Sequence, residues 1–402
     1  MLIVKKFGGS SVADAAKVHR VAGIIADEYS EGHDVVVVLS AQGDTTDDLL
    51  DKAAEINPNA SKREIDVLLS TGEQISVALM AMALEKIGLP VVSLTGWQIG
   101  LETDSNYGRA RIKRVSIERL RREIDKRHIV LVAGFQGVNK FDDITTLGRG
   151  GSDTTAVAVA AVLHADKCQI YTDVEGVYTT DPRIVSEAQK LNEITFDEML
   201  ELASLGAQVL HNRSVEMAKR YSVNLEVLSS YVRKPGTIVK EVVKPVEQMK
   251  ISGVAKDINV SRIAIEGVPD EPGKAFKVFS VLAKAKINVD IILQSVGKGH
   301  TNDISFTIAS SDAKTAYDAI MEYQEAIGFA RASVDEDVAK VSIVGAGMIS
   351  SPGIAALMFE ALGDEKINIK MISTSEIKVS VLIDKDYADQ AVQAIHKKFF
   401  SN

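Results

Sequence analysis

The stretch Thr145–Asp166, TTLGRGGSDTTAVAVAAVLHAD, decides how the rest of the sequence is interpreted. Its first half is a glycine-rich loop with one cation and one carboxylate, and its second half, Thr154–His164, is apolar almost all the way round. A helix of that kind is buried, and the unpaired N–H groups of its first turn can bind an anion. The stretch therefore predicts a buried helix, capped by Ser152, that presents its N-terminus to a ligand. An ordinary helix start with a permissive turn is the alternative.

Size and composition predict a globular protein of two or three domains. The chain has 402 residues, with 46% hydrophobic and 25% charged residues, and it exceeds one typical core. A net charge of −9 argues against nucleic acid as a partner. The single cysteine, Cys168, allows neither an internal disulfide nor a cysteine-based zinc site. The N-terminus lacks a signal peptide, and no apolar run approaches the roughly 18 residues of a membrane helix. We therefore expect a cytoplasmic protein without a membrane partner.

Strands and helices alternate through the first 230 residues, which predicts an α/β fold with a doubly wound, mostly parallel sheet. A glycine inside a helix costs roughly 1 kcal/mol, so Gly72 predicts a break, with Glu73 opening the next helix as a favourable first-turn charge. The expected strands are 1–4, 34–40, 90–94, 128–135, 167–172 and 223–229, and the expected helices are 12–31, 46–56, 61–87 with the break inside it, 196–204 and 207–220.

Loops after these strands carry the residues of a candidate site, because ligands bind at the carboxyl ends of strands in open α/β sheets. Glycine loops with a lysine and carboxylates suit a nucleoside triphosphate with Mg²⁺, and no histidine spacing predicts protein metal ligands. A carboxylate acceptor is already ionised at neutral pH and needs no general base. It needs a cation that relieves its repulsion from the phosphoryl group, and Lys6 suits that role. The candidate side chains are Lys6, Glu73, Arg149, Asp153, Asp173, Asp181 and Arg183.

The C-terminal part of the chain contains an internal repeat with an offset of 80 residues. Pro272-Gly273 matches Pro352-Gly353, and Ile287-Asn288-Val289 matches Ile367-Asn368-Ile369. Each copy predicts a small α+β unit. We therefore expect domains at 1–245, 250–335 and 336–402. A strand at 250–257 precedes the first copy and is a candidate to complete the second, so consecutive and interleaved units both remain open.

Seven segments, in order, carry a clear resemblance to the aspartate kinase (aspartokinase) family of the amino-acid kinase superfamily. They are VKKFGGSSV, VVVVLSAQGDTTD, LLSTGEQIS, VAGFQGVN, TTLGRGGSDTTAV, IYTDVEGVYTTDPRI and DEMLELASLGAQVLH. The repeated tail resembles the paired ACT domains of monofunctional, feedback-regulated members. The resemblance implies ATP-dependent phosphorylation of the side-chain carboxylate of L-aspartate to 4-phospho-L-aspartate, the first step toward lysine, threonine and methionine, with ATP and Mg²⁺ as cofactors.

The resemblance also assigns roles in the active site. Lys6, Asp153 and Arg149 would be catalytic, with Arg149 pairing with a substrate carboxylate. Many family members have Lys and Pro where this chain has Gln208 and Asn212, so one cation near the nucleotide is missing. The implied substrate-binding residues are Thr46, Glu73, Arg149, Gly150, Gly151 and Ser152, and the implied ATP-binding residues are Lys6, Phe7, Gly8, Gly9, Thr172, Asp173, Tyr178, Arg183, Gln208 and Val209.

In the tail, the resemblance implies an effector site for lysine, threonine or both, and a homodimer through the ACT domains or a higher oligomer. Two small domains that only dimerise are the alternative. A catalytically weak amino-acid sensor, and a sister kinase acting on glutamate, N-acetylglutamate or a nucleotide, are the other functions to weigh. The implied effector-binding residues are Asp270, Asn288, Asp290, Gln294, Asn368, Ile369, Ser375 and Glu376.

Overall fold

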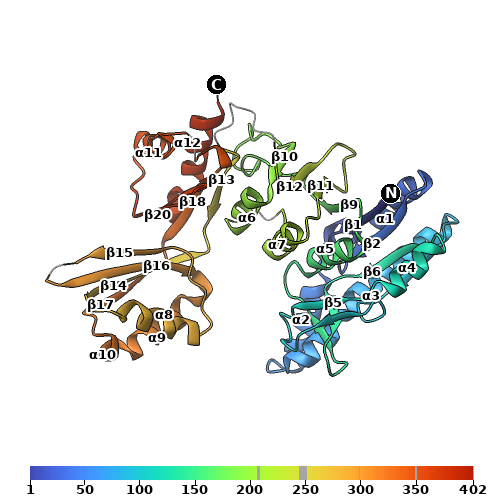
Figure 1. The fold of residues 1–402 in the computed structure, drawn as a ribbon, viewed down its shortest axis with the longest axis horizontal. Helices are drawn as coiled ribbons and strands as arrows, with labels where there is room; N and C mark the ends of the chain where they lie inside the picture. Colours follow the sequence, from blue (N-terminus) through green and yellow to red (C-terminus); the bar gives the residue numbers. More distant parts are fainter. Residues whose placement is uncertain (206–208, 244–250, 298, 349–350, 402) are drawn as a thin grey trace. The chain divides into compact units, whose positions relative to one another are not determined.

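The computed structural model describes residues 1–205, 209–243, 251–297, 299–348 and 351–401, and it divides into two compact units (Figure 1). Unit 1 comprises Met1–Val177, Lys190–Ala203 and Gln208–Lys244, and unit 2 comprises Tyr178–Gln189, Ser204–Ala207 and Pro245–Asn402. The boundary between the units does not fall at one position near residue 245, because Tyr178–Gln189 belongs to the second unit.

Unit 1 is built on an eight-stranded sheet with the order β10-β12-β11-β9-β1-β2-β6-β3. The six strands from β11 to β3 are mutually parallel, and β12 and β10 run the other way at one edge. The fold class predicted from the sequence is therefore confirmed. The strands are β1 (Leu2–Phe7), β2 (Asp34–Leu39), β3 (Val91–Leu94), β6 (Ile129–Ala133), β9 (Lys167–Thr172), β10 (Glu193–Thr195), β11 (Leu225–Ser229) and β12 (Thr237–Lys240).

Helices cover both faces of this sheet, which explains why β2 and β6 are nearly continuous apolar runs. Side chains of α1 (Ala15–Ser30) and α3 (Lys62–Lys86) form a core with β2 and β6 on one face. The buried helix α5 (Gly151–Leu163) packs on β1, β2 and β9, with α7 (Asn212–Arg220) against it. The remaining helices of unit 1 are the short 3₁₀ turn η1 (Gly9–Val12), α2 (Thr45–Ile56), α4 (Glu118–Asp125) and α6 (Phe196–Ser204).

Helix α3 corrects two expectations. It runs unbroken from Lys62 to Lys86, so the break predicted at Gly72 is wrong. A Cβ atom on Gly72 would lie 2.8 Å from Cβ of Ala41, so this glycine permits a close approach of the loop after β2. By length and hydropathy alone α3 also meets the criterion for a membrane span, at a mean hydropathy of 1.5, which the sequence analysis did not foresee. Half of that window is buried inside the fold, as in the core helix of a globular protein.

A second, four-stranded sheet in unit 1 has the order β5-β4-β7-β8 and leads into the glycine-rich loop. The side chain of Asp66, in α3, is hydrogen-bonded to this part of the chain. Its oxygens accept hydrogen bonds from the backbone N–H groups of Gly108 and Thr146 and from the hydroxyl of Thr146. This buried carboxyl therefore fixes the strand that precedes the loop. The strands are β4 (Leu101–Thr103), β5 (Ile112–Val115), β7 (Gln136–Val138) and β8 (Ile144–Thr146).

Unit 2 contains two antiparallel four-stranded sheets, with the orders β15-β16-β14-β17 and β13-β18-β20-β19. Strand β13, which precedes the first repeat, pairs with β18 in the sheet of the second repeat. Its strands are β13 (Gly253–Asp257), β14 (Val260–Pro269), β15 (Ile292–Val296), β16 (Thr301–Ala309), β17 (Arg331–Asp335), β18 (Val338–Val344), β19 (Met371–Thr374) and β20 (Lys378–Asp384). Its helices of four or more residues are α8 (Lys274–Lys284), α9 (Ala313–Glu322), α10 (Gln324–Ile327), α11 (Ile354–Asp364) and α12 (Ala388–Phe400).

The segment Tyr178–Gln189 is part of unit 2 because it packs into the second repeat. The carbonyl of Thr179 accepts a 2.7 Å hydrogen bond from N–H of Val254, and its hydroxyl lies 2.9 Å from Nε2 of His396. Val185 belongs to the core of β18, α11 and α12. The chain segment that follows β9 is thus anchored in the second repeat by both backbone and side-chain contacts.

Candidate active site

Four parallel strands of unit 1 end at one edge of the sheet, and backbone hydrogen bonds join the loops that follow them. N–H of Gly43 donates to the carbonyl of Gly9 over 3.0 Å, and N–H of Gly134 donates to the carbonyl of Leu39 over 3.0 Å. A Cβ atom on Gly9 would lie 2.6 Å from the carbonyl oxygen of Ala41, so only glycine fits there. The loops form a cradle with exposed backbone, as an anionic ligand requires.

Lys6 and Asp153 meet at this edge. Nζ of Lys6, from β1, lies 2.6 Å from Oδ1 of Asp153, in the first turn of α5, and each side chain is 12% exposed. The ammonium group has three N–H donors, so the contact with one carboxylate oxygen leaves others available to a ligand. A partly buried cation beside a glycine cradle can neutralise a phosphoryl group.

The glycine-rich loop approaches its neighbours too closely for any other residue. Gly150 has φ = 70°, and a Cβ atom there would lie 2.2 Å from Cγ of His211. The N-cap of α5 is Gly150, so the prediction of Ser152 as N-cap is wrong: Ser152 lies inside the first turn and is buried. Nη1 of Arg213 donates a 2.5 Å hydrogen bond to the carbonyl of Leu147, which fixes the start of the loop.

His211 is a site residue that the sequence analysis missed, since it placed no histidine in these loops. Burial, together with the charges of Arg213 and Arg149, lowers the pKa of the ring, although Asp153 opposes this effect. Nδ1 accepts a hydrogen bond from N–H of Arg213 and caps α7, so this nitrogen carries no proton. His211 therefore supports the loop as a neutral ring.

Glu73 is buried in the middle of α3 and lies beside the loop after β2. Its side chain is 3% exposed, and Oε1 accepts a 3.0 Å hydrogen bond from N–H of Ala41. Burial raises the pKa of this carboxyl to about 7. Oε2 is buried and has no hydrogen-bond donor among the residues that the structure describes. A positively charged ligand group at Oε2 would satisfy the orphaned oxygen and stabilise its charge.

The other residues predicted to bind substrate or nucleotide differ in their exposure and in their hydrogen bonds. Arg149 is exposed, and in the described part of the chain its side chain has no hydrogen bond or ion pair. Thr46 is half-buried in the first turn of α2. The hydroxyl of Thr172 donates to Oδ1 of Asp173 over 2.9 Å. Phe7 is fully buried and stacks on Tyr171, so only its backbone is available. Val209 is half-buried, and Gln208 lies outside the described residues.

Two of the predicted nucleotide residues, Tyr178 and Arg183, lie in unit 2. The guanidinium of Arg183 makes a two-point contact with Asp181, with Nη2 2.7 Å from Oδ2. This hydrogen bonding lowers the pKa of Asp181. The side chain of Arg183 is 88% exposed, so this contact contributes little to stability.

The predicted effector residues lie in both repeats of unit 2, and Asn288 and Asn368 occupy equivalent places. Gly273 and Gly353 both have φ = 90° and begin α8 and α11, as the Pro-Gly turns predicted. Oδ1 of Asp270 accepts a 2.8 Å hydrogen bond from Asn302, and Asp290 is paired with Lys340 of the other repeat. Ile369 is half-buried, whereas the exposed members of the set are Asp270, Asn288, Asp290, Gln294, Asn368, Ser375 and Glu376.

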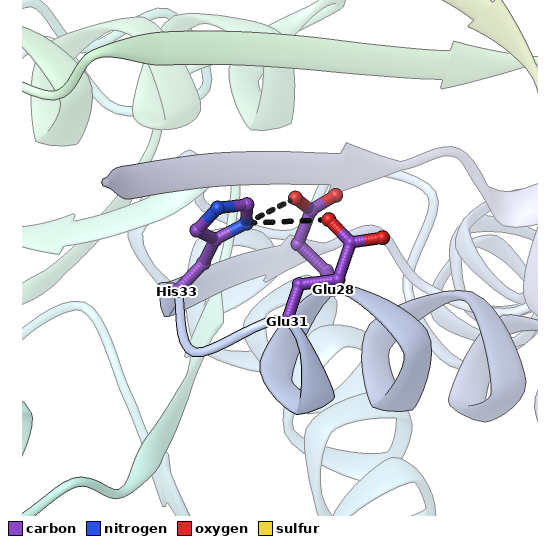
Figure 2. Close-up of side chains that lie close together, drawn as sticks. All are labelled: Glu28, Glu31 and His33. Carbon is purple, nitrogen blue, oxygen red and sulfur yellow. Dashed lines mark hydrogen bonds and ion pairs between the residues drawn. The ribbon is translucent and has the colours of Figure 1, made fainter.

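Within the described residues, one group of side chains has the spacing of metal ligands, namely Glu28 and Glu31 at the end of α1 and His33 in the next loop. Figure 2 shows the His33 ring turned toward both carboxylates, with Nδ1 2.7 Å from Oε1 of Glu28. Nζ of Lys5 lies 2.7 Å from Oε2 of Glu28. Burial would raise the pKa of Glu28, but the contacts with Lys5 and His33 outweigh it and lower the pKa. Lys5 and Lys6 alternate along β1, so this cluster and the Lys6 site use opposite faces of the sheet.

Comparisons with known proteins agree with this geometry. The sequence model of the amino acid kinase family matches residues 1–229, and that of an ACT domain matches residues 263–323 and 341–399. The chain is 51% identical to an aspartokinase of Mycolicibacterium smegmatis, over 99% of this chain and 96% of that protein.

Two solved structures of E. coli aspartokinase III are also similar over the full length of both chains, at 28% identity. The complex with aspartate and ADP, called the R-state, matches with a TM-score of 0.83, and the complex with lysine and aspartate, called the T-state, matches with 0.76. Sequence, fold and the glycine cradle agree: the chain belongs to the amino acid kinase family and, within it, to the aspartokinases.

Proposed function

We propose that this chain transfers the γ-phosphoryl group of ATP to the side-chain carboxylate of L-aspartate and yields 4-phospho-L-aspartate, the first step toward lysine, threonine and methionine. The observation that carries the proposal is the Lys6–Asp153 ion pair at the point where the glycine loops converge. The chain's relatives of about 50% identity support it, since they are aspartokinases over almost their whole length.

The chemistry needs charge neutralisation more than proton transfer. The β-carboxylate of aspartate is ionised at neutral pH, so it attacks without a general base. Lys6 lies beside Gly8 and neutralises the negative charge that the transferring phosphoryl group and the attacking carboxylate share. Gly9 supplies its backbone N–H group to the triphosphate, and glycine fits this position because a Cβ atom has no room there, whereas the N–H of Gly8 donates to the carbonyl of Tyr171. Mg²⁺ bound to the phosphates of the nucleotide would neutralise part of their negative charge.

The substrate side of the site is formed by the glycine-rich loop and α3. Arg149 takes a carboxylate of aspartate through a two-point contact, which is possible because its guanidinium is exposed and has no partner in the described part of unit 1. Glu73 receives the α-ammonium group at its orphaned Oε2. Thr46, Gly150, Gly151 and Ser152 complete this side. On the nucleotide side, Thr172, Asp173 and Val209 of unit 1 take part, and Tyr178, Arg183 and Gln208 keep the role that the family resemblance implies for them.

Unit 2 regulates the kinase through its two ACT repeats, with lysine, threonine or both as effectors. The ACT match supports this role, as does the lysine-bound structure of E. coli aspartokinase III. The domains are 1–245, 250–335 and 336–402, except that Tyr178–Gln189 groups with unit 2 and β13 completes the second repeat by its pairing with β18. The working protein is a cytoplasmic homodimer through the ACT domains, or a higher oligomer.

An ATP-dependent hydroxamate assay tests this function, because hydroxylamine traps the acyl phosphate as it forms. The purified chain with MgATP is expected to give hydroxamate with aspartate and far less with glutamate. Lysine and threonine, added separately and together, are expected to lower the rate in at least one combination. Absence of hydroxamate in every condition would favour the reading of the chain as an amino-acid sensor.

A further inference from the structure

Gln136 is a fully buried residue of β7 that none of the roles above uses. Its backbone is fixed on one side by Gly96, where a Cβ atom would lie 2.1 Å from the carbonyl oxygen of Gln136. The residue before it, Phe135, donates a hydrogen bond from its backbone N–H to the hydroxyl oxygen of Thr155 in α5, over 3.2 Å. Gln136 therefore projects from a rigid segment that contacts the start of the helix carrying Asp153.

The hydrogen bond to α3 fixes the orientation of the Gln136 side-chain amide. Nε2 donates a 2.7 Å hydrogen bond to the carbonyl of Ser70. The reverse orientation would bring two acceptor oxygens together at that distance, so the amide oxygen must be the free end. Oε1 is buried and, within the residues described, has no donor.

A second orphaned acceptor lies on the same turn of α3. The carbonyl of Ser70 points along the helix toward the next turn, which carries Glu73 three residues on. Oε2 of Glu73 is also buried and without a donor in the described chain. Unpaired buried acceptors are rare in folded proteins, and a pair of them, one on α3 and one on a β7 side chain hydrogen-bonded to the same helix, indicates a ligand that brings donors.

We propose that Oε1 of Gln136 accepts a hydrogen bond from the α-ammonium group of the amino-acid substrate, beside the carboxylate of Glu73. An ammonium group offers three donors and a positive charge, so it can satisfy both acceptors at once. Gln136 is in this way a specificity-determining residue that favours an α-amino acid over a dicarboxylate without the amine. The inference rests on the proposed function, since it concerns the binding of aspartate.

Succinate is the matched probe, because it keeps the carboxylates of aspartate and lacks the amine. The experiment measures the Kd of aspartate and of succinate by calorimetry for the full-length enzyme and for Gln136→Leu. The control is Gln74→Leu, since Nε2 of Gln74 donates to the same Ser70 carbonyl over 3.2 Å but leaves no orphaned acceptor. Gln136→Met, with a side chain of nearly equal length, replaces Gln136→Leu if that variant does not fold.

In Gln136→Leu the preference for aspartate over succinate is expected to fall about 10–100-fold, the scale of one hydrogen bond to a charged group. The control should keep the wild-type preference. An equal loss of both ligands would mean that Gln136 only supports α3, and an unchanged preference would mean that an ordered water satisfies Oε1. Either result overturns the inference. Failure of the wild-type enzyme to phosphorylate aspartate would instead overturn the proposed function.

Discussion

Replacement of Glu73 by glutamine should make the stability of the protein less dependent on pH. The wild-type carboxyl is buried, with 3% of its surface exposed, and its pKa is raised from 4.5 to about 7. The folded state therefore binds a proton that the unfolded state releases between pH 4.5 and 7. The contribution of Glu73 to wild-type stability is therefore fully present below pH 4.5, and it is lost as the pH rises through 7. Glutamine does not titrate, so the variant lacks this loss.

The magnitude follows from the size of the pKa rise. At 1.36 kcal/mol per pKa unit, the rise corresponds to about 3 kcal/mol of stability lost by the wild type above pH 7. For a unit of roughly 230 residues, this is about 6–12 °C in the midpoint of thermal unfolding. The midpoint of thermal unfolding of Glu73→Gln should thus rise relative to that of the wild type between pH 5 and pH 8, and the difference should then level off.

Thermal unfolding followed by circular dichroism at several pH values between 5 and 9 provides the assay. Glu55→Gln, at an exposed position of α2, controls for the loss of one negative charge. Only the change with pH matters, because an offset that is equal at every pH reports altered packing or hydrogen bonding. A difference between Glu73→Gln and wild type that stays constant from pH 5 to 9 would refute the account of Glu73 as a buried, proton-binding carboxyl.

Three further substitutions test the rest of the site. Lys6→Ala should lower kcat by roughly 10²–10³-fold, the scale of one preorganised charge-stabilising group, and steady-state kinetics with near-wild-type turnover would remove the assigned role. Arg149→Lys keeps the charge but loses the planar two-point contact, so KM for aspartate should rise about tenfold or more while KM for ATP stays the same. Gly150→Ala should cost activity and thermal stability together, because φ = 70° and the 2.2 Å approach to His211 leave no room for a methyl group; a fully active, equally stable variant would contradict this packing.

Sequence patterns predicted the parts of the fold that depend on local order along the chain. The apolar run of α5 and the β-branched run of β2 identified buried elements, because burial on all sides removes the usual polar face. The position of Lys6 at the end of a strand placed it at the ligand edge, and the ion pair with Asp153 joins two residues far apart in sequence that the motifs had singled out.

Contacts between distant segments were beyond the reach of those patterns. The propensity cost of Gly72 predicted a helix break, but its close packing on Ala41 keeps α3 continuous and buries Glu73 in mid-helix. His211 supports Gly150 from a segment about 60 residues away, and no local pattern signals that contact. The nearest available signal was its place at the end of the GAQVLH segment, which the family resemblance had already marked.

The central claim is that unit 1 uses Lys6 to transfer a phosphoryl group from ATP to the side-chain carboxylate of aspartate. Phosphorus-31 NMR of the enzyme with MgATP and aspartate, followed by trapping with hydroxylamine, tests it most directly. The account predicts an acyl-phosphate signal and a side-chain hydroxamate with the wild type, both strongly reduced in Lys6→Ala. ADP formed without any acyl phosphate, or equal yields from wild type and Lys6→Ala, would contradict it.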